Sequence, residues 1–243
     1  MWHSGQWDHG PAEKAIQAGT DLLLFIHNEQ AGSYMTTQPK TTRAPRIYLA
    51  GDTVFRPAAA ELFRAMKDIC TAAGLEGVCP FDGQAEVDAL APGAETSLLI
   101  ARLDRDLMDG CDAGVFCLDP FRRAADMDPG TAVEIGYMAA QGKMLAGYTV
   151  DGRPYPRKVA EYRSRAWGDA LRERQGTGGS GGMEDADGLI VHSEGMVQNA
   201  MTEGFIRLSG GTVCVDADLL TAFAMAIDSL RQRLPGSAAP HNN

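Results

Sequence analysis

The chain has 243 residues, 44% hydrophobic and 22% charged, so it can bury a sizeable core and is not disordered over most of its length. Its 32 acidic residues outnumber 22 lysines and arginines, and the net charge of −10 disfavours nucleic acid and anionic membranes as partners. Five cysteines without CxxC spacing argue against a disulfide framework and a zinc site. No apolar run is long enough to span a membrane, and none has the flanks of a signal peptide, so we expect a cytoplasmic protein.

The chain divides into three regions by composition. Residues 1–45 are expected to be an N-terminal arm that ends in a polar, proline-containing linker at 35–45. Met35 precedes this linker, and the sequence leaves open whether translation starts there or residues 1–34 are an appended arm. Residues 46–234 are expected to form the domain, and residues 235–243 a disordered tail.

The first half of the domain alternates short apolar runs with longer amphipathic ones. Residues 47–50 predict a strand, and a helix follows from Pro57 to about Gly74. Residues 77–80 predict a second strand, residues 81–95 a loop, and the stripe Leu99, Leu103 and Leu107 a helix that ends near Gly110.

The second half continues the same alternation. Residues 113–118 predict a central strand that is apolar on both faces, followed by a helix after Asp128 and a strand at 144–148. A polar helix is expected at about 157–174, then a flexible glycine- and serine-rich insertion at 176–182, a strand at 212–215 and a helix at 219–230. The pattern predicts an α/β fold: a flavodoxin-like, doubly wound parallel sheet with helices on both faces.

Ligands of such a sheet bind beyond the carboxyl ends of its strands, where several polar side chains are expected. Tyr48 lies in the first strand, Asp119 follows the central strand, Asp128 and Glu134 flank the start of the next helix, and Asp106 lies near the end of the preceding one. The sequence has neither a Walker-type phosphate loop nor a dinucleotide fingerprint, so we expect no nucleotide cofactor and no metal.

Glu134 stands in an apolar setting that is unusual for a solvated carboxylate. The helix dipole would keep it ionised and desolvation would oppose this. An ionised glutamate here could attack an anomeric carbon, as carboxylates of glycosidases do. It could equally cap the helix or pair with Arg122 or Arg123, and spacing alone favours that structural role.

A family resemblance changes the balance between these two roles. Residues 106–122 and 128–137, together with residues 47–51, resemble the signature of the nucleoside 2-deoxyribosyltransferases. The match runs in order from about Arg46 to Gly204, is interrupted by the glycine and serine insertion, and is most specific from 112 to 142.

The resemblance implies a role for each matching residue. Glu134 corresponds to the nucleophile, Tyr48 to the tyrosine that orients it, Asp106 to the proton donor for the leaving base, and Asp128 to the aspartate that holds the deoxyribose hydroxyls. Gln84 resembles a base-contacting glutamine. Asn199 and Met201 match a segment that reaches the substrate 5′-hydroxyl from a neighbouring subunit, although Ala200 replaces the usual leucine between them.

The implied reaction is an exchange of bases on a 2′-deoxynucleoside through a covalent deoxyribosyl-glutamate, in a homo-oligomer without cofactors. Its partners would be deoxynucleosides and free nucleobases. An aspartate at 128, where a related subgroup that cleaves nucleotide monophosphates has a serine, favours free nucleosides. Two alternatives stay open: hydrolysis of the same bond on the same fold, and a non-catalytic binding or signalling module in which Asp52 would help to bind magnesium.

Overall fold

The protein was analysed as a computed structural model that describes residues 43–87, 89–174, 182–193 and 195–235. Residues 1–42 and 236–243, and with them almost all of the expected arm and tail, lie outside the described residues, so these two expectations stay predictions. The same holds for most of the glycine- and serine-rich insertion, of which the structure describes only Gly182. No described helix has the length and apolar character that crossing a membrane requires.

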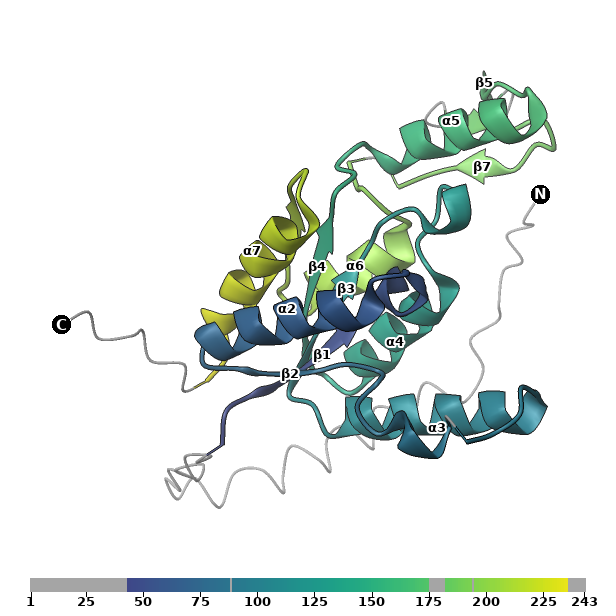
Figure 1. Cartoon of the computed structure of the whole chain (residues 1–243). Helices are drawn as coiled ribbons and strands as arrows, with labels where there is room; N and C mark the ends of the chain where they lie inside the picture. Colours follow the sequence, from purple (N-terminus) through teal and green to yellow (C-terminus); the bar gives the residue numbers. More distant parts are fainter. Residues whose placement is uncertain (1–42, 88, 175–181, 194, 236–243) are drawn as a thin grey trace, which may run out of the picture. The chain divides into compact units, whose positions relative to one another are not determined.

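The centre of the domain is a parallel five-stranded sheet (Figure 1). Its strands are β1 (Arg46–Ala50), β2 (Glu76–Val78), β3 (Ala113–Cys117), β4 (Met144–Thr149) and β8 (Val213–Val215), in the order β2-β1-β3-β4-β8. The pairing of β1 with β3 sets Tyr48 opposite Gly114. This confirms the predicted doubly wound α/β fold, in which the direction of winding reverses between β1 and β3 and ligands bind at the carboxyl ends of these strands.

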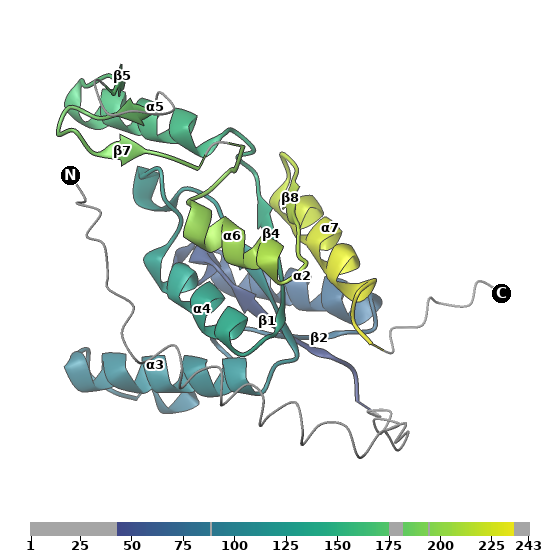
Figure 2. The ribbon, with the colours of Figure 1, turned by 180° about the vertical axis from the view of Figure 1, so that it is seen from behind.

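Helices cover both faces of the sheet (Figures 1 and 2). On one face, side chains of α2 (Ala59–Ala72) and α7 (Leu219–Arg231) form a hydrophobic core with the sheet. On the other face, α4 (Pro129–Ala140) and α6 (Ala200–Leu208) contribute to a second core. Helix α3 (Ala94–Asp109) lies beside α4. Because successive strand residues point to opposite faces, Ile47 and Leu49 join the first core and Tyr48 and Ala50 the second. This alternation directs Tyr48 toward α4.

The region after β4 differs from the expectation. Helix α5 (Tyr155–Trp167) is shorter than the predicted 157–174, because Gly168 adopts a left-handed φ of 71° and ends it. Three two-residue strands that were not predicted follow: β5 (Arg172–Glu173), β6 (Met183–Glu184) and β7 (Ile190–Val191) form an antiparallel sheet. Three short 3-10 helices, η1 (Asp52–Phe55), η2 (Gln84–Glu86) and η3 (Phe121–Arg123), lie in the loops.

Candidate active site

Tyr48 and Glu134 meet between β1 and α4. The Tyr48 hydroxyl donates a 2.8 Å hydrogen bond to Oε1 of Glu134. The Tyr48 side chain is fully buried, so strand β1 fixes the position of its hydroxyl. Glu134 sits next to Ile135, on an α4 face whose buried residues are Thr131, Ile135 and Met138. The structural role considered for Glu134, an ion pair with Arg122 or Arg123, is not what the structure contains: Arg122 instead stacks on Phe121.

The surroundings of Glu134 make it an unusual carboxyl group. Burial raises its pKa to about 8, the hydrogen bond from Tyr48 opposes that rise, and repulsion by Asp104 and Asp128 adds to it. Glu134 is the sixth residue of α4, beyond the first turn where the helix dipole acts most strongly. Of the two opposing influences expected from the sequence, desolvation therefore dominates.

Asp104, which the sequence analysis did not single out, is the carboxylate that α3 directs toward this pair. Burial raises its pKa, and its charge in turn raises the pKa of both Tyr48 and Glu134. Gln84, in η2, lies beside it, with Nε2 3.5 Å from Oδ1 of Asp104. A base-contacting candidate, a carboxyl group and the tyrosine–glutamate pair are therefore neighbours.

Asp106, by contrast, is not part of this group, which corrects the expectation that it lies at the base side of the site. Its side chain is 54% exposed and forms a 2.7 Å ion pair with Arg105. Two residues along an α-helix turn the side chain by about 200°, so Asp104 and Asp106 point to opposite sides of α3. The sequence did hold a signal: Asp104 is four residues before Met108, the buried residue of α3.

Asp128 caps helix α4 through one of its two carboxylate oxygens. It is buried at the N-cap of α4, where its Oδ2 accepts hydrogen bonds from the backbone N–H (2.8 Å) and hydroxyl (3.0 Å) of Thr131. Pro129 at the first helical position completes a strong helix start. These hydrogen bonds use only Oδ2, so Oδ1 stays available to a ligand hydroxyl.

Asn199 and Met201 lie at the start of α6. Asn199 is the N-cap, and its Oδ1 accepts a 2.9 Å hydrogen bond from the backbone N–H of Met201. Tyr155, at the start of α5, donates its hydroxyl to Asp126, a residue two positions before Asp128. Met201 is 61% exposed on the surface of α6, and no described contact joins it to Glu134.

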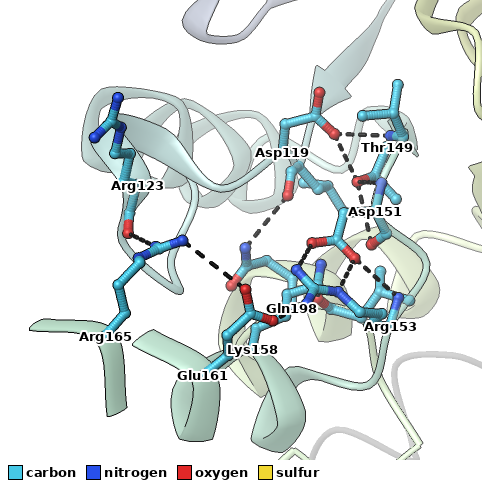
Figure 3. A network of polar contacts seen from close by, with 12 residues as sticks. Asp119, Arg123, Thr149, Asp151, Arg153, Lys158, Glu161, Arg165 and Gln198 are labelled. Atoms are coloured by element: carbon cyan, nitrogen blue, oxygen red, sulfur yellow. Dashed lines mark hydrogen bonds and ion pairs between the residues drawn. The ribbon is translucent and has the colours of Figure 1, made fainter. Parts of the chain in front are cut away.

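A second group of carboxylates lies at the same edge of the sheet (Figure 3). Asp119, just after β3, accepts hydrogen bonds from the Thr149 hydroxyl (2.7 Å) and the Val150 N–H (2.8 Å) and pairs with Arg56 at 3.3 Å. Arg56 also pairs with Asp52 at 2.9 Å. The acidic side chains that a magnesium-binding receiver would use are therefore occupied by an arginine, which weighs against that interpretation.

The catalytic candidates differ from this second group in their lack of cations. No ion pair of the described residues involves Asp104, Asp128 or Glu134. In the part of the chain that the structure describes, no cluster of His, Cys, Asp and Glu has the arrangement of a metal site. The site thus combines a hydrogen-bonded glutamate, a second carboxyl group of raised pKa and an overall negative charge.

Comparison with known proteins identifies the family to which these features belong. A model of the nucleoside 2-deoxyribosyltransferases matches residues 47–201. The chain belongs to the nucleoside 2-deoxyribosyltransferase family. An uncharacterized protein of Schizosaccharomyces pombe is 68% identical over 192 residues, which are 79% of this chain and 91% of that protein.

Two solved structures are also similar to this family member. A 2-desoxiribosyltransferase from Leishmania mexicana is 27% identical, with 76% of this chain and 97% of that one covered and a TM-score of 0.49. A CMP N-glycosidase from Clostridium botulinum is 12% identical, with 75% and 98% covered and a TM-score of 0.37. The family match confirms the resemblance seen in the sequence and extends from β1 to the first turn of α6.

Proposed function

We propose that this member of the deoxyribosyltransferase family exchanges the base of 2′-deoxynucleosides through a covalent ester on Glu134. The observation that carries the proposal is the 2.8 Å hydrogen bond from Tyr48 to Oε1 of Glu134, next to a second carboxyl group at Asp104. Tyr48 engages one oxygen of the nucleophile and favours its charged form, and the other oxygen is left to attack the anomeric carbon.

The first half of the reaction uses both carboxyl groups. Oε2 of Glu134 forms a bond to C1′ while the bond from C1′ to the base nitrogen breaks, and the base leaves with the electron pair of that bond. Asp104 supplies a proton to the departing base. In the second half, a nitrogen of another base attacks C1′, the ester bond to Glu134 breaks, and Asp104 takes the proton that the incoming nitrogen loses. The cycle restores both groups and retains the configuration at C1′.

This scheme requires the pair to hold one proton. Burial raises the pKa of Asp104, and it raises that of Glu134 to about 8, which favours one proton held by the pair near neutral pH. The reactive arrangement places that proton on Asp104 and the charge on Glu134, and the Tyr48 hydroxyl favours it.

The substrate class follows from the charge of the site. Asp104, Asp128 and Glu134 have no cationic partner among the described residues, so a dianionic 5′-phosphate would be repelled and neutral deoxynucleosides are favoured. Gln84 would contact the base beside Asp104, and Asp128 would hold a deoxyribose hydroxyl through Oδ1. Asn199 of a neighbouring subunit, through its amide, would bind the 5′-hydroxyl.

We propose further that the protein is a homo-oligomer, in which a second copy covers the surface of α4 and α6. These helices lie side by side (Figure 2) and expose three apolar side chains along their surfaces: Val133 (71% exposed), Met201 (61%) and Leu208 (82%). Val133 directly precedes Glu134, and Met201 is two residues from Asn199. Light scattering on the full chain tests this assembly, and a monomer mass at micromolar concentration would refute it.

The reaction is tested by incubating the protein with a 2′-deoxynucleoside, with and without a second free base, and separating the products by chromatography. The expected result is a new deoxynucleoside only when the second base is present, and its loss by a factor on the order of 10⁴ in Glu134→Ala. Free base released equally in both incubations would replace transfer by hydrolysis. No reaction with any purine or pyrimidine donor would refute the proposed function.

A further inference from the structure

The loop after β2 is attached to helix α2 by an ion pair. Nζ of Lys67, on α2, lies 2.5 Å from Oδ1 and 2.6 Å from Oδ2 of Asp82. Oδ2 of Asp82 also accepts a 3.0 Å hydrogen bond from the backbone N–H of Cys79, and the Asp82 N–H donates to the Cys79 carbonyl at 2.9 Å. The Asp82 carboxylate therefore closes the loop upon itself and fastens it to the helix.

Strand β2 provides the space through which Lys67 reaches this loop. A Cβ atom on Gly77, in the middle of β2, would lie 3.2 Å from Cγ of Lys67, so the aliphatic stem of the lysine lies over a position without a side chain. A second contact holds the residue before Asp82: the Phe81 ring packs edge-to-face against Phe63 of α2, with 5.3 Å between the ring centroids. Two consecutive residues of the loop are therefore attached to α2.

The attached loop ends next to the candidate site. Gly83 alone separates Asp82 from Gln84, the first residue of η2. Gly83 has a left-handed φ of 109°, a conformation that glycine adopts at little steric cost, and it redirects the chain there. Beyond this turn, Nε2 of Gln84 lies 3.5 Å from Oδ1 of Asp104 on α3. An ion pair on α2 thus fixes the start of the turn that brings an amide group beside a carboxyl group of α3.

We propose that Lys67 and Asp82 are positioning residues that set the place of Gln84 and thereby determine which bases the enzyme selects. The inference rests on the proposed function, in which the base binds beside Asp104 because that carboxyl group exchanges a proton with it. An amide presents a donor and an acceptor at fixed positions, and nucleobases differ in the donors and acceptors along their edges. A displacement of the amide by about 1 Å therefore changes the binding of different bases by different factors.

The test is a competition between acceptor bases in wild type and Lys67→Met, which keeps the aliphatic stem over Gly77 and removes the ammonium. One deoxynucleoside donor is incubated with an equimolar mixture of adenine, hypoxanthine, cytosine and thymine, the donor's own base being absent from the mixture. Chromatography then gives the initial ratio of the new deoxynucleosides. This ratio equals the ratio of the kcat/KM values of the competing bases, so it does not depend on how much of the protein is active.

The expected result is a change of at least about fivefold in the ratio of the two most abundant products. If wild type uses a single base, the expected result is a KM for that base about fivefold higher in Lys67→Met, with kcat within about twofold. Arg46→Met is the matched control, because Arg46 pairs with Glu76 at 3.1 Å at the other end of β2 and is about as exposed as Lys67 (30% against 33%). Its product ratio should match that of wild type.

Two further variants separate positioning from general loosening of the fold. Asp82→Asn breaks the ion pair from its other side, keeps an oxygen for the Cys79 N–H, and should change the ratio in the same direction even if Lys67→Met does not fold. In a Gln84→Ala background, Lys67→Met should change the ratio no further. An unchanged ratio in both variants of the ion pair, the same change in Arg46→Met, or additive effects in the double variant would each overturn the inference alone. If wild type forms no new deoxynucleoside with any base, the proposed function itself fails, and the inference fails with it.

Discussion

Two groups of carboxylates lie along the same edge of the sheet and have opposite surroundings. Asp151, in the network of Figure 3, forms hydrogen bonds with the guanidinium of Arg153, which lower its pKa below the ordinary value. Asp119, in the same network, pairs with Arg56. Glu134 has a phenol and two carboxylates as neighbours, and burial raises its pKa to about 8.

This difference in surroundings shows how carboxylates can have two different roles within one fold. Carboxylates that are paired with arginine keep their charge and join loops. Here Asp119, which follows β3, is linked to the loop that follows β4. A buried carboxyl group that has no cationic partner can hold a proton near neutral pH. When two such groups lie close together, one can act as the nucleophile and the other as the general acid. Substitutions at either kind of carboxylate can therefore be compared with matched substitutions at the other.

After the loss expected for Glu134→Ala, the largest effect is expected from Asp104→Asn, compared with Asp106→Asn on the same helix. Without its proton donor the enzyme should lose about 10²- to 10³-fold in kcat/KM at the pH optimum, whereas Asp106→Asn should stay within about twofold. The loss of activity above pH 8, where the pair gives up its last proton, should also disappear in Asp104→Asn. Steady-state rates of base exchange against pH measure both effects. A larger loss in Asp106→Asn than in Asp104→Asn would reverse the assignment.

Asp104 and Asp106 also show which features of the site could not be predicted from the sequence. The five parallel strands were predictable because continuous apolar runs such as residues 113–117 identify buried strands, and Glu134 and Tyr48 were found through the family resemblance. The resemblance selected Asp106, whereas the structure partly buries Asp104, because matching sequence segments ignores which side of a helix faces inward. Only the stripe shared with Met108 distinguishes the two aspartates.

Other elements left too little signal in the sequence. Helix α6 was not predicted as a helix, since it is short and contains Gly204, which weakens helix propensity. The strands β5, β6 and β7 have two residues each, too few to show the alternation of a strand. The hydrogen bond from Tyr155 to Asp126 joins residues from two separate segments, so nothing in the local pattern predicts it.

An intermediate effect, on stability rather than on catalysis, is expected from Arg56→Met. This change removes the cation shared by Asp52 and Asp119 and leaves the buried Asp119 without an ionic partner. The free energy of unfolding should fall by roughly 2 kcal/mol, since a partly buried pair is broken by the loss of one member. The exchange rate of the remaining folded protein should stay within about twofold.

Urea unfolding at pH 7 measures this change, and Arg105→Met provides the matched control. Arg105 and its partner Asp106 are both about half exposed, so the control should lose less than about 0.5 kcal/mol. Equal losses in the two variants would mean that the buried ion pair of Asp119 contributes no more to stability than the exposed ion pair of Asp106. A catalytic defect in Arg56→Met that matches that of Asp104→Asn would mean that the paired group also takes part in the reaction.

The smallest effect is expected from Tyr48→Phe, which removes the hydrogen bond from Tyr48 to Glu134. In wild type, kcat/KM should fall above pH 8, as the pair loses the proton that it must hold. The Tyr48 hydroxyl stabilises the charged Glu134, so Tyr48→Phe raises the pKa of Glu134 and moves this fall to higher pH by about one unit. A higher pKa at Glu134 also draws the shared proton away from Asp104. The population of the reactive arrangement, and with it the maximal kcat/KM, should therefore drop by about the same factor, roughly tenfold.

Tyr137→Phe is the control for this prediction, because Tyr137 lies on α4 as Glu134 does but donates its hydroxyl to Asp109 at 2.8 Å. Its pH profile should match that of wild type. The two changes in Tyr48→Phe are linked through one equilibrium, since each unit by which the pKa of Glu134 rises moves the descending limb and lowers the maximum together. A lower maximum with an unmoved limb would mean that Tyr48 contacts the substrate rather than tuning the carboxyl pair.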